Sequence, residues 1–351
     1  MPRILTVLVF SFFLFSCGSD PELEIIEGFY HPEDLEVLPD ESLLLVSEYG
    51  GLNGEHATVL SLINIVTQER SILFPNASTK AVEEDAAIWG NSDCPGAPEE
   101  IAPHGIHMGQ RSDGTDQLLV VNHRGRESVE FFELTGKDTQ DPGLIWRGCV
   151  VAPDKEVWFN DVATLPGNGF VVTHMMPHGD ISELLQRAET DQEPTGYVLE
   201  WLPETQWKKI PKSEGAINNG ILASADGLTL YVAHYLGNQV VAIDRISGEN
   251  LWTAQMPSPD NLSFNKSGAL LIASHAATLA EVRACSHSES DYCGINFSIV
   301  LVDPEDGSSQ TIIEGSGAPF GGATVAVEAG DRIVMGSFTG NRIAITKNVI
   351  N

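Results

Sequence analysis

One short pattern recurs six times along the chain, and it constrains the fold more than any other feature. Each copy contains an apolar segment, a tight turn rich in Pro, Asp, Asn or Gly, a second apolar segment and a polar residue. The turn residues favour chain reversal, and the Val, Ile and Leu on either side favour strands, so we interpret each copy as a β-hairpin. The copies lie at residues 34–47, 106–123, 162–174, 221–234, 262–275 and 324–337.

Further strand-like segments follow most copies, for example residues 128–134, 239–244 and 342–346. Small antiparallel sheets that recur along a chain bury their faces by radial stacking. The sequence therefore predicts an all-β fold, a six-bladed β-propeller over residues 25–351. A β-sandwich is the alternative, but it does not require six similar units. One helix is expected, at residues 180–188, on a loop outside the sheets.

The N-terminal segment resembles an export signal. Arg3 precedes an apolar run over residues 4–15, too short to span a bilayer, and Leu14-Phe15-Ser16-Cys17 resembles a bacterial lipoprotein cleavage box. We expect a signal peptide over residues 1–16, a lipidated Cys17 and a polar tether over residues 17–24. An ordinary secretory signal is the alternative, and both predict export. The lipoprotein interpretation places the protein in the bacterial cell envelope, in the periplasm or as an outer-membrane lipoprotein.

Four further cysteines would then lie in an oxidising compartment, where an even number favours disulfides. Local pairing suggests Cys285 with Cys293, which leaves Cys94 with Cys149. Four cysteines allow three pairings, so this pairing is a preference.

The charge of the chain disfavours a nucleic acid or an anionic lipid surface as partner. It has 49 acidic against 19 basic side chains, a formal net charge of −30. Such a field repels phosphates and concentrates cations near clustered carboxylates. A divalent metal ion is therefore the partner to expect.

In a propeller blade, the residues just before the first strand and just after the second strand share one end of the molecule. At the first of these positions, successive repeats place carboxylates and amides, which are hard oxygen ligands of the kind that Ca²⁺ prefers. Asn and Asp that merely cap strand ends are the alternative. The predicted calcium ring consists of Glu33, Asn160, Asn219, Asp260 and Asn261.

Two histidines belong to one blade. His104 starts the first strand of the second repeat and His123 follows its second strand, so antiparallel pairing makes them neighbours. Beside a metal ion, two adjacent imidazoles can act as a general-base relay. A lone histidine at a strand end is usually a satisfied surface residue, and we apply that interpretation to His174, His178 and His234.

These residues resemble the calcium-dependent paraoxonase and arylesterase family, within the senescence-marker-protein and gluconolactonase superfamily of propeller hydrolases. The resemblance spans Ile25 to Thr346. The matching segments are Glu33-Asp34-Leu-Glu-Val-Leu-Pro39, Pro103-His-Gly-Ile106, Val120-Val-Asn-His123, Asn160-Asp161, Asn219-Gly-Ile, Asp260-Asn261 and Ala323-Thr-Val-Ala326.

The resemblance implies two calcium ions. A catalytic ion would be held by the predicted ring, and a deeper structural ion by Asp34, Asp161 and the carbonyl of Ile106. It also implies a catalytic dyad of His104 and His123, and a substrate pocket lined by His275 and Thr324. The family chiefly hydrolyses lactones, and less selectively aryl esters and phosphotriesters.

Two departures from the family pattern stand out. No Cys follows Cys293, so the disulfide that joins the chain ends in the family has no counterpart, and ring closure must rest on strand pairing. The segments at residues 175–185 and 79–100 also differ from the family and are expected to border the pocket.

We therefore predict an exported, calcium-dependent hydrolase of small-molecule lactones and related esters, in contact with a membrane only through its lipid anchor. Calcium would stabilise the oxyanion while the histidine pair activates water. No G-x-S-x-G nucleophile motif occurs in the chain. Two alternatives remain: a non-catalytic, lipid-anchored propeller that binds a partner through its metal-bearing face, and a propeller that carries a redox cofactor.

Overall fold

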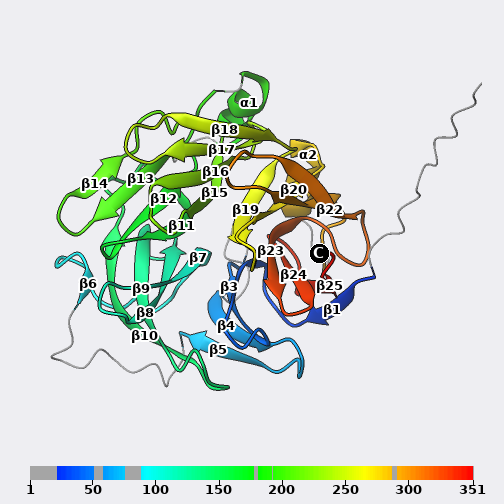
Figure 1. The fold of residues 1–351 in the computed structure, drawn as a ribbon, viewed down its shortest axis with the longest axis horizontal. Helices are drawn as coiled ribbons and strands as arrows, with labels where there is room; N and C mark the ends of the chain where they lie inside the picture. The colour runs from blue at the N-terminus through cyan, green and yellow to red at the C-terminus, as the bar shows by residue number, and fades with distance from the viewer. Residues whose placement is uncertain are drawn as a thin grey trace, which may run out of the picture.

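The computed structural model describes residues 22–50, 58–75, 88–177, 181–191, 193–286 and 291–350. The predicted signal peptide, Cys17, most of the tether and His178 lie outside these residues. In the described part, the strands form six sheets, which Figure 1 shows arranged as blades around a common axis. The predicted six-bladed β-propeller is confirmed, and the β-sandwich is excluded.

Blades 1 to 3 follow one another along the chain. Blade 1 contains β2 (Pro32–Val37), β3 (Leu43–Glu48), β4 (Val59–Asn64) and β5 (Arg70–Phe74). Blade 2 contains β7 (Pro103–Gln110), β8 (Asp116–Asn122), β9 (Ser128–Thr135) and β10 (Gly143–Val151), with the short β6 (Trp89–Gly90) added at its outer edge. Blade 3 contains β11 (Phe159–Leu165), β12 (Gly169–His174), β13 (Tyr197–Leu202) and β14 (Gln206–Lys209).

Blades 4 to 6 complete the ring. Blade 4 contains β15 (Asn218–Ala223), β16 (Thr229–His234), β17 (Gln239–Asp244) and β18 (Asn250–Gln255). Blade 5 contains β19 (Pro259–Phe264), β20 (Leu270–His275), β21 (Phe297–Val302) and β22 (Ser309–Gly315). Blade 6 contains β23 (Ala323–Ala329), β24 (Arg332–Ser337), β25 (Arg342–Lys347) and β1 (Glu24–Glu27).

Each of the six predicted hairpins forms the first two strands of a blade. The turns between them use the expected residues, such as Gly227 and Gly268, which adopt left-handed backbone conformations. Glycine has no Cβ and takes these conformations without strain. The hairpin repeat in the sequence therefore corresponds to the inner half of every blade.

The ring closes without a covalent link between its ends. The N-terminal strand β1 pairs antiparallel with β25 near the C-terminus, with Glu24 opposite Ile345 and Glu27 opposite Arg342. Figure 1 shows the blue β1 beside the red β25. Closure by strand pairing, as expected from the absence of a cysteine after Cys293, is what the structure shows.

The hydrophobic core is divided among the blade interfaces. Six of the apolar clusters in the described residues each join two neighbouring blades. The cluster between blades 6 and 1, for example, contains Val334 of β24 and Leu44 of β3. Burial therefore ties each blade to its neighbours and keeps the first strands close to the axis.

Two helices lie outside the sheets. The helix α1 (Ile181–Asp191) is close to its predicted position and packs Leu184, Leu185 and Ala188 against an apolar cluster at one end of the propeller. The helix α2 (Leu279–Ser286) follows β20 and was not predicted. Among the described residues, no helix is long and apolar enough to cross a membrane.

Candidate active site

The candidate site is built from the starts of the six first strands. In every blade, the pairing register between the first two strands shifts by one residue at this point, for example between Pro32 and Asp34 and between Asn218 and Ile221. A β-bulge of this kind breaks the strict alternation of a strand and re-aims its side chains. The bulges explain how adjacent residues, such as Asp260 and Asn261, both join a polar cluster at the axis.

A cavity of about 760 Å³ opens at this end of the propeller. Many of its polar residues come from the strand starts, whereas Arg283 and Ser286 come from α2, and most of its wall is apolar. The structure brings most of the predicted site residues together here: the cavity is lined by Glu33, His104, Asn160, Asn219, Asp260, His275 and Thr324. Asn261 is buried next to them, and its amide nitrogen donates to Glu33 Oε1 at 2.8 Å.

Four oxygen atoms of the predicted calcium ring are buried and have no hydrogen-bond partner in the described part of the protein. A buried acceptor left unsatisfied costs about 1–3 kcal/mol. A hard cation would satisfy all four at once, so the donor set fits calcium better than zinc or copper. The atoms are Glu33 Oε2, Asn160 Oδ1, Asn219 Oδ1 and Asn261 Oδ1.

Among the described residues, no lysine or arginine contributes to the pKa values of Glu33 and Asp260 in this cluster. Burial raises the pKa of Glu33 well above its usual range, and the nearby charges of Asp34 and Asp260 raise it further. Burial likewise raises the pKa of Asp260. The imidazoles of His104 and His275 lie 3.8 and 3.7 Å from Glu33 and Asp260, but burial lowers the pKa of both histidines. A bound cation would supply the missing positive charge.

No group of three or more His, Cys, Asp or Glu side chains within the described ranges is arranged to hold a metal ion. The predicted ring does not have that composition, because three of its five members are asparagines. Any ion bound there would depend mainly on amide oxygens and two carboxylates.

A second polar layer lies next to the ring. Asp34 accepts a hydrogen bond from the backbone N–H of Ile106 at 2.7 Å, and Asp161 accepts one from Ile221 at 2.7 Å. A Cβ at Gly105 would clash with the Asp161 carboxylate, so glycine permits this close approach. Each aspartate thus links its blade to the next one, and burial raises the pKa of Asp34 to about 7 and that of Asp161 well above its usual range.

The two histidines of blade 2 are in direct contact. His104 Nδ1 and His123 Nε2 lie 2.9 Å apart, as the antiparallel pairing predicted. Tyr49 stacks on His104 with ring centroids 4.8 Å apart. On its other side, His123 Nδ1 lies 2.9 Å from Glu127 Oε2. Tyr49 and Glu127 were not among the predicted site residues; the four-residue spacing between His123 and Glu127 is the only sequence feature that points to one of them.

His275 is held by two hydrogen-bond partners. Its Nε2 lies 2.9 Å from the carbonyl oxygen of Ala323, which can only accept, so Nε2 carries the proton. The hydroxyl of Tyr235 then donates to His275 Nδ1 at 2.8 Å. Both nitrogens are engaged, which suits a role in shaping the pocket.

Three histidines were expected to be surface residues, and for two of them this was wrong. His174 is 3% exposed and His234 is 6% exposed. The strand ends here are covered by the loops between blades, so a polar residue that ends a strand is not in solvent. Neither lines the cavity.

The wall of the cavity comes largely from segments outside the sheets. Met175, Met176 and Leu185 contribute from the region of α1, and Leu279 and Val282 from α2. The unpredicted α2 begins with a capping box, in which Thr278 N donates to Glu281 Oε2 at 2.8 Å and Glu281 N donates to Thr278 Oγ1 at 3.3 Å. The expected bordering of the pocket is therefore observed for residues 175–185, at Met175, Met176 and Leu185. For residues 79–100 it is not: no residue in the described part of that segment lines the cavity.

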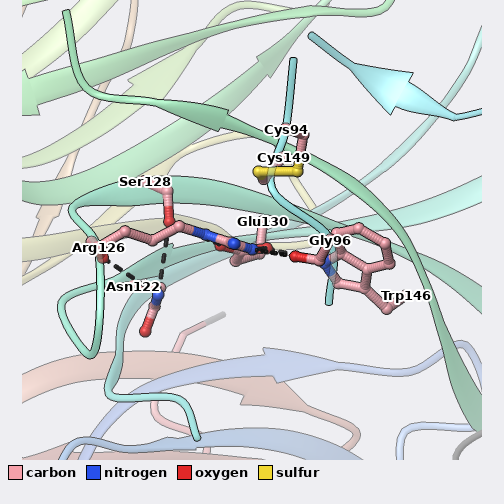
Figure 2. The surroundings of a disulfide bond; sticks show 8 residues. All are labelled: Cys94, Gly96, Asn122, Arg126, Ser128, Glu130, Trp146 and Cys149. Carbon is pink, nitrogen blue, oxygen red and sulfur yellow. Dashed lines mark hydrogen bonds and ion pairs between the residues drawn. A yellow bond between two sulfur atoms is a disulfide. The ribbon is translucent and has the colours of Figure 1, made fainter. Parts of the chain in front are cut away.

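Both preferred disulfides are present, Cys94–Cys149 and Cys285–Cys293. Figure 2 shows the first, with Arg126 directed at Glu130 and at the carbonyl of Gly96. Together these contacts fix the segment at residues 91–102, which leads directly into β7 and His104. The disulfide thus supports the position of the histidine pair.

Comparison with known proteins agrees with this architecture. A family model described as Arylesterase matches residues 26–343. No curated protein matches the chain. A gluconolactonase from Xanthomonas campestris has a TM-score of 0.53 at 12% identity, over 93% of this chain and 89% of that chain. A luciferin-regenerating enzyme has a TM-score of 0.52 at 11% identity, over 94% and 96%. At such identity these structures show a shared fold alone.

Proposed function

Since the chain belongs to the arylesterase family, we propose that it is a calcium-dependent hydrolase of lactones and related aryl esters. One observation carries this proposal. Buried oxygen atoms that have no hydrogen-bond partner among the described residues form a ring at the end of a cavity with a largely apolar wall, and His104 lies beside them, facing Glu33. A metal ion held by this ring could bind an ester carbonyl, and the wall suits the apolar part of a substrate.

Calcium would be held by Glu33, Asn160, Asn219, Asp260 and Asn261, and when bound it supplies a positive charge that stabilises a developing oxyanion. We assign the structural ion to Asp34, Asp161 and the carbonyl of Ile106. The hydrogen bonds that Asp34 and Asp161 accept from backbone N–H groups of neighbouring blades support a role for this layer in stability.

His104 would act as the base that takes a proton from water. Burial lowers its pKa well below the ordinary value, so its imidazole is neutral at pH 7 and can accept a proton. His123 lies beside it and disperses the positive charge that follows. His275, Tyr235 and Thr324 shape the pocket, and the side chains from α1 and α2 exclude water from its wall.

A panel of small lactones and phenyl acetate tests the proposal, assayed with calcium, after stripping on a chelating resin, and after re-addition of calcium or magnesium. We expect hydrolysis that stripping abolishes and calcium restores. Binding of calcium without turnover of any panel member would refute the hydrolase proposal and favour the non-catalytic propeller.

We further propose that the protein is exported and anchored through a lipid on Cys17, with residues 1–16 removed. The two disulfides support an oxidising compartment. Expression in a bacterial host with radiolabelled palmitate should label the wild type and leave Cys17→Ser unlabelled; equal labelling of both would refute the anchor.

A further inference from the structure

Glu127 contacts the histidine pair at His123, on the side away from His104. Both of its oxygens face His123 Nδ1, at 2.9 and 3.1 Å. Oε1 also accepts the backbone N–H of Phe159 at 2.6 Å, which ties Glu127 to the strand that carries Asn160. Its side chain is only 15% exposed. The Glu127 carboxylate is therefore held in one position by specific contacts.

The turn that carries Glu127 keeps its arginines away from it. Arg126 is directed at Glu130 (Figure 2) and binds it through two nitrogens. The two donor–acceptor distances are 2.7 and 2.8 Å. Arg124 pairs with Glu100 at 3.2 Å. The Asn122 amide nitrogen bonds to the carbonyls of both arginines and fixes the turn. The Glu127 carboxylate is thus hydrogen-bonded to His123 and to one backbone N–H.

The directions of these hydrogen bonds can be deduced one after another. An ionised carboxylate only accepts, so His123 Nδ1 must donate to Glu127. A neutral His123 then has a lone pair at Nε2 and must accept from His104 Nδ1. A neutral His104 with its proton at Nδ1 has a lone pair at Nε2, the nitrogen nearest the Glu33 carboxylate.

Without Glu127, the opposite order would be equally possible. His123 Nε2 would donate to His104 Nδ1, and His104 would present an N–H to the cavity in place of a lone pair. A group with that N–H cannot take a proton from water. The tautomer of a histidine is set by the bond that its other nitrogen makes, and here that choice passes through two rings.

We propose that Glu127 is a positioning residue that fixes both histidines as Nδ1–H tautomers, so that His104 presents an unprotonated nitrogen to the cavity. This inference rests on the proposed function for its catalytic meaning, but not for the tautomers themselves. Glu127 also lies where it stabilises positive charge on the pair after a proton is taken up.

The first test needs no measurement of activity and no variant of Glu127. Nitrogen-15 NMR of histidine-labelled, calcium-loaded wild-type protein at pH 8 reports the tautomer of each ring, with His104→Gln and His123→Gln used to assign the two signals. We expect both to be Nδ1–H tautomers. An Nε2–H tautomer at either residue overturns the proposal, whatever the enzyme assays show.

The second test uses Glu127→Gln. The amide oxygen of the glutamine can still accept the hydrogen bond from the Phe159 N–H. The NH₂ group would then donate to His123 Nδ1, so the protons of both histidines would move to Nε2. We expect kcat to fall about 100-fold or more, within the range of general-base effects, with KM and the calcium requirement unchanged. The matched control Glu100→Gln removes a carboxylate that pairs with Arg124 of this turn, and it should keep both tautomers and kcat.

The outcomes separate the two proposals. If the wild type hydrolyses none of the esters but shows the expected tautomers, the proposed function fails and this inference stands. If Glu127→Gln retains the wild-type tautomers, or changes only KM or calcium requirement, Glu127 has a merely structural role and the inference is wrong.

Discussion

Removal of metal ions should make the stability of this protein strongly dependent on pH. In the metal-free protein, burial raises the pKa of Asp34 from 3.8 to about 7, and the pKa values of Glu33, Asp161 and Asp260 shift in the same direction. A carboxyl group with a raised pKa binds its proton more tightly in the native state than in the unfolded state. Between the two pKa values the native state therefore carries more protons, and its stability falls as pH rises.

The magnitude follows from the same values. For Asp34, the interval from 3.8 to about 7 corresponds to about 4 kcal/mol, at 1.36 kcal/mol per pKa unit. This stabilisation is fully present below pH 3.8 and is lost by about pH 7. The other three carboxyl groups, whose pKa values are raised by burial as well, add to the loss. A bound cation favours the ionised carboxylates, and at a concentration 100 times its Kd it adds about 2.7 kcal/mol.

The pH dependence of the free energy of unfolding can be measured by urea unfolding followed by tryptophan fluorescence. The measurement compares protein stripped on a chelating resin with calcium-loaded protein, at pH 5 to 8. We expect the free energy of unfolding of stripped protein to fall over this range, and the gap between the two forms to widen. Asp34→Asn should reduce the slope by up to about 1.4 kcal/mol per pH unit. Asp226→Asn, at an exposed turn, should leave it unchanged.

Stripped protein must be compared with calcium-loaded protein, and Asp34→Asn with Asp226→Asn, because the net charge of −30 also destabilises the native state as pH rises. That general repulsion acts on the stripped wild type and on the stripped Asp226 variant alike. Buried histidines, whose pKa values are lowered, act in the opposite direction below about pH 6.5 in both forms. A gap between stripped and calcium-loaded protein that does not widen between pH 5 and 8, or an Asp34→Asn variant with the wild-type slope, would therefore refute the assignment of the buried carboxyl groups.

Three further predictions concern single sites. His104→Gln should lower kcat about 100- to 10,000-fold at an unchanged calcium requirement, measured by lactone hydrolysis, and retention of most turnover would count against the dyad. Glu33→Gln should raise the calcium concentration for half-maximal activity, because it removes one of the two charges in the ring; an unchanged requirement would remove Glu33 from the ligands. Replacing Cys94 and Cys149 by Ser should cost about 4 kcal/mol in urea unfolding, since that disulfide spans 55 residues, against about 2.5 kcal/mol for the other, which spans 8; equal losses would contradict the chain-entropy argument.

The fold was predictable because each copy of its repeat has a local sequence pattern. Each hairpin has its own turn residues and its own apolar flanks, so six copies could be recognised without knowledge of long-range contacts. The closure of the ring by β1 was predictable for a different reason: without a cysteine near the C-terminus, strand pairing was the remaining means of closure.

The features that were missed depend on contacts that leave a weak trace in the sequence. The helix α2 has no buried residue and is eight residues long, so its hydrophobic periodicity is slight; only the Thr278 and Glu281 pair marks its start. Glu127 follows a turn with two arginines, where a carboxylate is ordinarily a solvated or paired surface residue. Only the fold shows that both arginines bind other carboxylates.

The bulge at the start of each first strand explains how a symmetric fold produces an asymmetric site. The same strand position carries Glu33, His104, Asn160, Asn219, Asp260 and Thr324 in the six blades. Four of these can bind a cation through oxygen, whereas blade 2 contributes an imidazole. An imidazole therefore lies beside the oxygen ring because His104 occupies one position of that ring. The second layer, with Asp34 and Asp161 bonded to the next blades, can hold the blades together without contacting substrate. Under the proposed function, substrate selection would fall to α1, α2 and their flanking loops, which can vary without disturbing either layer.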